Sequence, residues 1–312
     1  MRERAFTQQE GGRQSSPAAC GPLFLGIDGG GSKCKARLVD ASGALLAVAV
    51  AGPANAFQDQ AGAREAMLAS ARQALATAGL APELLGQLRV GAGLAGVNIP
   101  RVAGEMRQWQ HPFAALYLET DIHIACLGAH GGADGGIIVA GTGSVGYSYA
   151  GGRGSSVGGH GFPAGDHGSG AWLGLRALQS ALLALDQLGP ETGLLDAIER
   201  QLGATGTGLV DSMAGARPRE YGALAPLVLE CADAGDAVAV AIVAEGADYL
   251  TRLGRRLLDD GAPALAMLGG LAPRLLPWLA ADVRERVLAP VAEADVGAVQ
   301  LAMSAGADAA QA

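Results

Sequence analysis

The sequence predicts an α/β fold built from two similar halves. Two segments show the same succession of apolar strand, glycine turn and second strand: "GIDGGGSKCKARLVD" and "GIIVAGTGSVGYSYA". Their turns align at an offset of 112 residues, which is the size of a domain. Long stretches with helical spacing of apolar residues separate shorter apolar runs, as in α/β proteins. The matched residues of the two turns are Gly29 with Gly141, Gly31 with Gly143 and Ser32 with Ser144.

The residues after the first turn have the period of a strand. Cys34, Ala36 and Leu38 alternate with charged residues, so one face of the strand is buried and the turn closes a hairpin. Helical spacing that stops at or near a glycine predicts helices over residues 63–78, 170–188 and 237–258. Short apolar runs between these helices predict strands. They cover residues 87–93, 115–119, 136–140 and 264–268.

Composition narrows the class of protein. A chain of 312 residues, half of them hydrophobic, with a mean hydropathy of +0.26 can form two domains with separate cores. The net charge is −8 and the pI is near 5.1, without a basic cluster, so nucleic acid and anionic lipid are poor partners. The apolar runs are shorter than the roughly 18 residues that span a bilayer. We therefore expect a small-molecule ligand and no membrane segment.

The chain start and the cysteines indicate a cytoplasmic protein. Residues 1–22 are polar and glycine-rich, which predicts a flexible extension or a misplaced start rather than a signal peptide. The cysteines occur without a C-x-x-C pair, which argues against a zinc site, an iron–sulfur site or a disulfide framework. They are Cys20, Cys34, Cys126 and Cys231.

Neither glycine turn has the features of two common nucleotide-binding loops. A P-loop needs Lys before Ser or Thr and a helix after it, whereas Ser32 precedes Lys33 and a strand follows. The second turn matches G-x-G-x-x-G from Gly141 to Gly146, with Asp166 twenty residues further on. A strand follows this turn too, whereas a dinucleotide site requires a helix. Both loops are therefore read as hairpins.

Two glycine hairpins in tandem halves predict a phosphate clamp. Backbone N–H groups of both turns would surround the phosphates of a nucleotide in the cleft between the halves, as in the actin, hexokinase and Hsp70 superfamily. Asp28 ends the first strand and would hold Mg²⁺ through water; an acidic turn residue is the alternative, but an acid that closes an apolar strand ahead of three glycines favours the metal role. The expected nucleotide-binding residues are Gly29, Gly30, Gly31, Ser32, Lys33, Gly141, Thr142, Gly143, Ser144, Gly269 and Gly270.

Two further elements would complete such a site. "LYLETD" is an alternating strand that ends at Asp121, where a carboxylate could accept the proton of an attacking hydroxyl without an unusual pKa. The alternative role for Asp121, compatible with the first, is to cap the helix that follows. Gly269 and Gly270 follow a later strand and could let adenine lie against the backbone, but an ordinary strand-to-helix turn explains them equally well.

The motifs together resemble a known family. "GIDGGGSKCKARL", "GPANAF", "ETDIHIACLGAHGGADGGIIVAGTGSVGY", "VGGHGFPAGDHGSGAWLGLRALQSALLALD" and "PREYG" resemble the bacterial glucosamine kinases of the BadF/BadG/BcrA/BcrD ATPase family, relatives of N-acetylglucosamine kinases. The similarity runs from Leu23 to the C-terminus. It implies a ribonuclease H-like, actin-like ATPase fold whose two duplicated domains enclose a nucleotide cleft. It also implies a homodimer that uses ATP and Mg²⁺ to phosphorylate the 6-hydroxyl of an amino sugar.

The resemblance also assigns domains and sugar ligands. It implies an N-terminal domain over residues 23–120, a C-terminal domain over residues 121–294, and a last helix near 295–312 that packs back on the first domain. Asp121 would be the catalytic base. The sugar ligands would be Asn55, Asp121, Gly159 and Asp166.

Several activities are compatible with this family. N-acetylglucosamine kinases tend to carry Asn after the second turn, where this chain has Val145, so glucosamine is the expected substrate and N-acetylglucosamine the alternative. His160 and His167 could contact ligand or be polar loop residues. An ATP-hydrolysing dehydratase activator would need clustered cysteine ligands, and a sugar sensor would need a DNA-reading module. We expect neither of these two.

Overall fold

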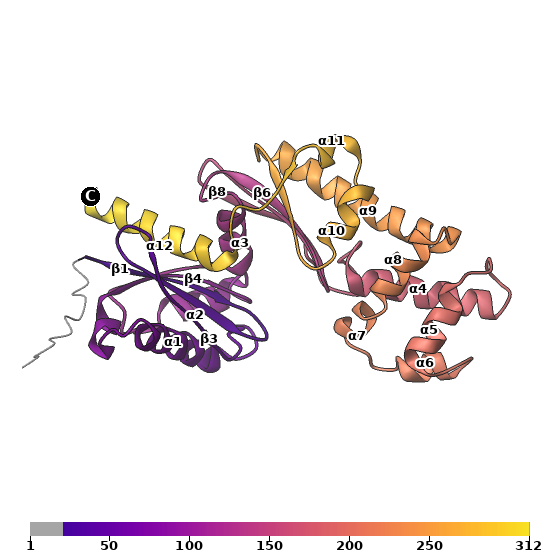
Figure 1. Ribbon diagram of the computed structural model, residues 1–312, viewed down its shortest axis with the longest axis horizontal. Coiled ribbons are helices and arrows are strands. Elements are labelled where there is room, and N and C mark those ends of the chain that lie inside the picture. The colour runs from indigo at the N-terminus through magenta and orange to yellow at the C-terminus, as the bar shows by residue number, and fades with distance from the viewer. Residues whose placement is uncertain (1–20, 312) are drawn as a thin grey trace, which may run out of the picture.

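The computed structural model describes residues 21–311 and contains two five-stranded sheets (Figure 1). The first sheet has the order β3-β2-β1-β4-β5 and the second the matching order β8-β7-β6-β9-β10. In each sheet the first three strands form an antiparallel meander and the other two run parallel to the first strand. The strands are β1 (Leu23–Gly29), β2 (Cys34–Val39), β3 (Leu45–Ala51), β4 (Leu88–Leu94), β5 (Ala115–Thr120), β6 (Gly135–Ala140), β7 (Ser144–Ala150), β8 (Arg153–Gly158), β9 (Leu265–Leu268) and β10 (Val287–Leu288).

The identical strand order confirms the predicted α/β, actin-like fold with duplicated halves. The first glycine turn joins β1 to β2, with the backbone N–H of Gly30 donating to the carbonyl of Lys33 at 2.9 Å. The second turn joins β6 to β7, with Gly141 donating to Gly143 at 2.9 Å. Both turns are hairpins, as the sequence predicts. The alternating residues of β2 are buried as expected, since Cys34 and its two apolar neighbours on that face have no exposed surface.

The three predicted helices are present, with shifted ends. They are α1 (Gln60–Thr77), α4 (Gly170–Leu185) and α9 (Ala237–Asp259). Helix α1 begins three residues early because the Asp59 side chain accepts a hydrogen bond from the N–H of Gly62 and caps it. The other helices are α2 (Pro100–Arg107), α3 (Asp121–Ala129), α5 (Leu194–Leu202), α6 (Gly208–Ser212), α7 (Pro218–Gly222), α8 (Ala225–Asp233), α10 (Ala272–Leu275), α11 (Ala281–Arg284) and α12 (Ala294–Gln311), and two short 3₁₀ helices are η1 (Pro82–Gln87) and η2 (Leu276–Trp278).

Two helices cross between the halves. Helix α3 follows β5 of the first sheet and packs on β6 and β7 of the second as well as on β4 of the first, whereas α12 follows β10 of the second sheet and packs on β1 and β4 of the first. The two helices also pack against each other, and Figure 1 shows α12 lying over the first sheet. Helix α1 covers the face of the first sheet opposite α12, and α9 covers the face of the second sheet opposite α3. Because α3 contacts both sheets, the domain boundary at residue 120 stays a prediction.

Small residues allow α12 to approach its neighbours closely. A Cβ atom on Gly297 would lie 2.0 Å from the carbonyl oxygen of Ile124 in α3. A Cβ atom on Gly91 of β4 would lie 2.0 Å from the carbonyl oxygen of Ala298. Glycine at these two positions is therefore a steric requirement of the crossing, because backbone atoms cannot move aside as a side chain could.

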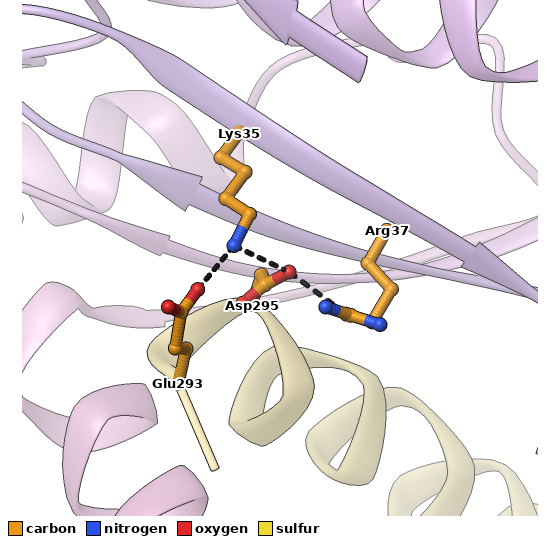
Figure 2. Close-up of polar contacts among 4 residues, drawn as sticks. All are labelled: Lys35, Arg37, Glu293 and Asp295. Carbon is orange, nitrogen blue, oxygen red and sulfur yellow. Dashed lines mark hydrogen bonds and ion pairs between the residues drawn. The ribbon is translucent and has the colours of Figure 1, made fainter. Parts of the chain in front are cut away.

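An ion-pair cluster fixes the start of α12 on β2. Asp295 has no exposed surface, and its Oδ2 atom lies 2.8 Å from Nε of Arg37 and 3.2 Å from Nζ of Lys35. Glu293, whose side chain is 76% exposed, also pairs with Lys35. Figure 2 shows the two cations of β2 pointing toward the two acids at the start of the helix. The cluster holds the returning chain on the first sheet.

Some predictions concern residues outside this description. Residues 1–20 of the predicted extension (residues 1–22), including Cys20, lie outside the residues that the structure describes. The cysteines at 34, 126 and 231 carry free thiols. None of the helices within residues 21–311 is long and apolar enough to cross a membrane.

Candidate active site

A cleft of about 560 Å³ lies between the two halves. The first half contributes residues at the ends of β1 and β5 and in the loop after β4, and the second half contributes residues of β6, β7, β8 and β9. The carboxyl ends of parallel strands collect at this edge, where ligands of open α/β sheets bind. The cleft is lined by Asp28, Gly96, Asn98, Thr120, Asp121, Ile122, Ala125, Val139, Val145, Ser156, Gly158, Gly159, Leu268 and Ala294.

Asp121 lies in this cleft as the first residue of α3. The helix cap is the preceding residue, because Oγ1 of Thr120 accepts a hydrogen bond from the N–H of His123 at 3.2 Å. The alternative interpretation of Asp121 as the cap is therefore wrong. Its Oδ1 atom accepts from the N–H of Ile122 at 2.9 Å. Burial raises the pKa of Asp121, and backbone hydrogen bonds partly offset this effect.

Asp28 lies in the same cleft, at the end of β1. Burial raises the pKa of its carboxyl, and the negative charges of Asp121 and Asp295 raise it further, while Lys33 and Lys35 lower it. A divalent cation would relieve the repulsion between the acids. In the part of the chain that the structure describes, no group of three or more His, Cys, Asp or Glu side chains could hold a metal directly. One carboxylate that reaches Mg²⁺ through water, with phosphates as further ligands, is compatible with this arrangement.

The first glycine turn, between β1 and β2, is exposed next to Asp28. Gly31, Ser32 and Lys33 are all accessible to solvent. Gly29 faces inward, where a Cβ atom would lie 2.4 Å from the side chain of Leu94. The carbonyl of Gly30 accepts from the N–H of Ala54 at 2.8 Å, which fixes the base of the turn. The turn is thus fixed at its base and open at its tip, which carries residues predicted to bind the nucleotide.

The second glycine turn (Gly141 to Ser144), hereafter the second phosphate turn because it is predicted to bind phosphate, borders a second cavity of about 450 Å³. Thr142 is exposed, whereas Ser144 is buried and its hydroxyl donates to the carbonyl of His167 at 2.8 Å. The structure therefore assigns the Ser144 side chain a role in fixing the loop, and leaves the turn's backbone facing the cavity. This cavity is lined by Gly141, Thr142, Gly170, Gly222, Pro226, Gly270 and Leu271.

The two glycines predicted next to adenine differ in their surroundings. Gly270 lines the second cavity, and a Cβ atom there would meet nothing within 4 Å. Gly269 has a φ of +98°, and a Cβ atom would lie 2.3 Å from the carbonyl oxygen of Ala140. The turn after β9 thus requires glycine at position 269, whereas the space next to Gly270 is open. Gly222 and Pro226, which line the same cavity, were not predicted individually, although "PREYG" ends at Gly222.

Asp166 and Gly159 belong to the loop after β8. Gly159 lines the first cleft with a φ of +68°. Asp166 has a φ of 59°, its Oδ1 atom accepts from the N–H of Gly161 at 3.1 Å, and its Oδ2 atom faces Gly143. Burial raises the pKa of Asp166, and His160 and His167 lower it. The Asp166 carboxylate therefore lies between the loop after β8, which borders the cleft, and the second phosphate turn.

Asn55 lies beside the cleft rather than in its lining. Its Oδ1 atom accepts from the N–H groups of Phe57 at 3.0 Å and Gln58 at 3.2 Å, so its amide nitrogen is the group that could contact a ligand. It is next to Gly96, which lines the cleft. Asn98 lines the cleft as well and was not predicted. Its position in the loop directly after β4 is the signal that could have identified it.

The fold and the site define a class of protein. Two duplicated α/β halves, a glycine hairpin on each and a cleft with two carboxylates are the features of an actin-like ATPase. Residues 25–299 match the BadF/BadG/BcrA/BcrD ATPase family, and the chain belongs to this family.

Three relatives are informative. The glucosamine kinase GspK of Vibrio cholerae is 35% identical over 279 residues, which cover 89% of this chain and 95% of that protein. An N-acetyl-D-glucosamine kinase of Dictyostelium discoideum is 29% identical over 248 residues, covering 73% of this chain and 76% of that protein. The crystal structure of a candidate N-acetylglucosamine kinase from Chromobacterium violaceum is 35% identical, covers 90% of this chain and 99% of its own, and superposes with a TM-score of 0.80.

Proposed function

We propose that this chain is an ATP-dependent hexosamine kinase that phosphorylates the 6-hydroxyl of glucosamine. The observation that carries the proposal is the meeting of Asp121, Asp28 and Gly159 in one cleft between the two halves. The similarity to a glucosamine kinase over most of both chains supports the choice of substrate class. The alternative substrate is N-acetylglucosamine, which the names of the other two relatives support.

The chemistry assigns a different task to each carboxylate. The oxygen of the sugar 6-hydroxyl attacks the γ-phosphorus, the bond to the β-phosphate oxygen breaks, and ADP leaves. Asp121 accepts the proton of the hydroxyl, and its raised pKa improves its match to that task near neutral pH. Asp28 would hold Mg²⁺ through water, and the ion would neutralise charge that develops on the phosphates. Backbone N–H groups of the two glycine turns would hold the phosphates.

The two cavities provide room for both substrates. The cleft with Asp121 would take the sugar and the reacting phosphate, and the cavity at Gly141, Thr142 and Gly270 would take the nucleoside. Val139 of β6 lines the cleft with Asp121, and Gly141, two residues further on, lines the second cavity. A nucleotide that extends from one cavity to the other would therefore pass the second phosphate turn.

The preference for glucosamine depends on charge. A protonated 2-amine gains from a carboxylate such as Asp166, which an acetamide cannot use. The apolar side chain of Val145 lines the cleft and offers an acetamide no hydrogen bond. A loss of about 1.5–3 kcal/mol for a substrate without the amine corresponds to a tenfold or larger difference in kcat/KM.

ADP release across a panel of monosaccharides tests the proposal. We expect the highest kcat/KM with glucosamine, with N-acetylglucosamine and glucose lower by a factor of about ten or more. Asp166→Asn should reduce this discrimination, whereas Asp134→Asn, at an exposed carboxylate on a distant turn, should not. A higher kcat/KM with N-acetylglucosamine would identify that sugar as the substrate. ADP release that no hexosamine stimulates would exclude the kinase function.

We further propose, from the family resemblance, that the chain forms a homodimer. Sedimentation equilibrium of the full chain tests this directly, and a single species at 31.1 kDa would contradict it.

A further inference from the structure

His123 of α3 and Tyr147 of β7 form a hydrogen bond where the two halves meet. The Nδ1 atom of His123 lies 2.6 Å from the hydroxyl oxygen of Tyr147. Both residues are buried, with 8% and 7% of their surface exposed. The ring of Tyr149, also on β7, contacts the His123 ring edge-on with centroids 4.9 Å apart. This pair thus joins the helix that follows the first sheet to a strand of the second sheet.

Each partner follows a functional element closely in the chain. Asp121 lies two residues before His123, at the start of α3. Ser144, the last residue of the second phosphate turn, lies three residues before Tyr147. Ile122 of α3 and Val145 of β7 line the cleft itself. The hydrogen bond therefore joins α3 to β7 next to residues that line the cleft, and its partners are close in the chain to the candidate base and to the candidate phosphate turn.

The surroundings keep both partners neutral. Burial lowers the pKa of His123, and Glu119 only partly opposes this effect. Burial also raises the pKa of Tyr147 well above its usual range. With both groups neutral, a single hydrogen bond joins Nδ1 of His123 to the Tyr147 hydroxyl, and the tautomer of His123 sets which of the two donates. A partner left alone here would be a buried polar group without a hydrogen bond, so the pair resists separation.

The other contacts of α3 with the second sheet place different constraints on it. Around the pair, α3 and β6 meet through apolar side chains, including Ala129 and Ile137, and such contacts have no preferred direction. In the middle of the helix, the Cys126 thiol donates to the carbonyl of Gly135 at 3.4 Å. At the far end of the helix, His130 hydrogen-bonds the carbonyl of Gly136 at 2.9 Å. The His123–Tyr147 bond is the directional side-chain contact at the cleft end. It can therefore set the orientation of the first turn of α3, which carries Asp121.

We propose that His123 and Tyr147 are positioning residues that fix Asp121 relative to the second phosphate turn. This inference rests on the kinase function proposed above. Loss of the bond would move the carboxylate relative to the γ-phosphate and leave the binding surfaces for sugar and nucleotide in place. A small misplacement of a reacting group lowers the rate of the chemical step. The expected signature is a lower kcat with little change in either KM.

Tyr147→Phe tests the proposal because it removes one buried oxygen and keeps the ring. We expect kcat to fall about tenfold, with both KM values within about twofold of wild type. The matched control is Tyr149→Phe, on the same strand and against the same imidazole, which should keep wild-type kcat. The isosteric pair His123→Asn and His123→Leu adds a rescue test. Asn can accept from Tyr147 and should keep more of the activity than Leu.

Thermal unfolding of each variant, measured at the assay conditions, separates positioning from stability. A folded Tyr147→Phe variant with the kcat of the Tyr149→Phe control would overturn the inference, and so would a change confined to KM. Adding Tyr147→Phe to His123→Leu should lower kcat no further, because the bond is already lost. Additive losses would also overturn it. Failure of the proposed function is distinguishable, because the wild-type chain itself would then show no hexosamine-dependent ADP release.

Discussion

Asp28 and Asp121 line one cleft from the ends of two strands, and the negative charge of Asp121 raises the pKa of Asp28. Their neighbours differ. Asp28 lies near Lys33 and Lys35, whereas Asp121 receives backbone hydrogen bonds at the start of a helix. This difference supports separate tasks, with Asp28 serving the metal and Asp121 serving the acceptor hydroxyl.

Replacing the candidate base should affect chemistry and spare nucleotide binding. We expect Asp121→Asn to lower kcat by about 10²–10⁴, because removal of a general base commonly has this effect. ATP affinity, measured by calorimetry, should stay close to wild type. The control is Asp196→Asn, which changes an exposed acid in the first turn of another helix, α5. Wild-type kcat in the Asp121→Asn variant would remove Asp121 from the mechanism.

The burial of Asp28, together with the crowding of carboxylates around it, should cost stability at neutral pH. The folded pKa of Asp28 is raised above its usual value of 3.8, so the ionised form is less favourable in the folded state. Asp28→Asn, without nucleotide or metal, should raise Tm at pH 7.5 by about 2–4 °C and abolish the kinase activity. The gain should shrink as pH falls through the raised folded pKa and should vanish below pH 3.8, where Asp28 is protonated in both states.

Asp40 provides a control of opposite sign for this measurement. Hydrogen bonds from Ser42 lower the pKa of the exposed Asp40 carboxyl, so its charge favours the folded state above pH 3.8. Asp40→Asn should therefore not raise Tm at pH 7.5. Equal gains in Tm from both substitutions would show that the charge of Asp28 is not the cause.

Of the two acids in the ion-pair cluster at the start of α12, Asp295 should contribute most of the stabilisation. Asp295→Ala leaves Lys35 and Arg37 without their buried partner, and we expect a loss of about 2–3 kcal/mol in the free energy of unfolding. Glu293→Ala removes an exposed partner of Lys35 and should cost about 0.5 kcal/mol or less. Urea denaturation measures both, and similar losses would contradict this ranking (Figure 2).

The crossing of α3 and α12 should not tolerate a side chain at Gly297. Gly297→Ala should destabilise the protein by about 2–3 kcal/mol, because the new Cβ atom meets the carbonyl oxygen of Ile124. Gly104→Ala in α2 is the matched control, since a Cβ atom there meets nothing within 4 Å. This control should stabilise the protein by about 0.5–1 kcal/mol. Equal effects of the two substitutions would contradict the close crossing.

We expect the two halves to close on sugar and ATP together. Water left in the cleft would compete with the sugar hydroxyl for the γ-phosphate. Small-angle scattering should give a smaller radius of gyration with glucosamine and a non-hydrolysable ATP analogue than with neither. An unchanged radius with both ligands bound would contradict closure.

The sequence alone determined the elements whose signal is local. The alternation at Cys34, Ala36 and Leu38 predicted a hairpin because side-chain period depends only on neighbouring residues. Repetition of the glycine turn at Gly29 and Gly141 predicted the duplication. Helix ends were less accurate, because caps such as Asp59 lie outside the apolar pattern that defines a helix. The position of Asp121 at a strand end was likewise readable from the chain.

Tertiary structure decided the contacts between distant residues. Asn98 and Pro226 belong to the two cavities only because separate strands and helices bring their loops together. Ser144 is buried under the carbonyl of His167, which no local pattern indicates. The exchange of α3 and α12 between sheets brings His123 to Tyr147 and Asp295 to Arg37. Such pairings arise from long-range packing, and a single sequence contains no periodic signal for them.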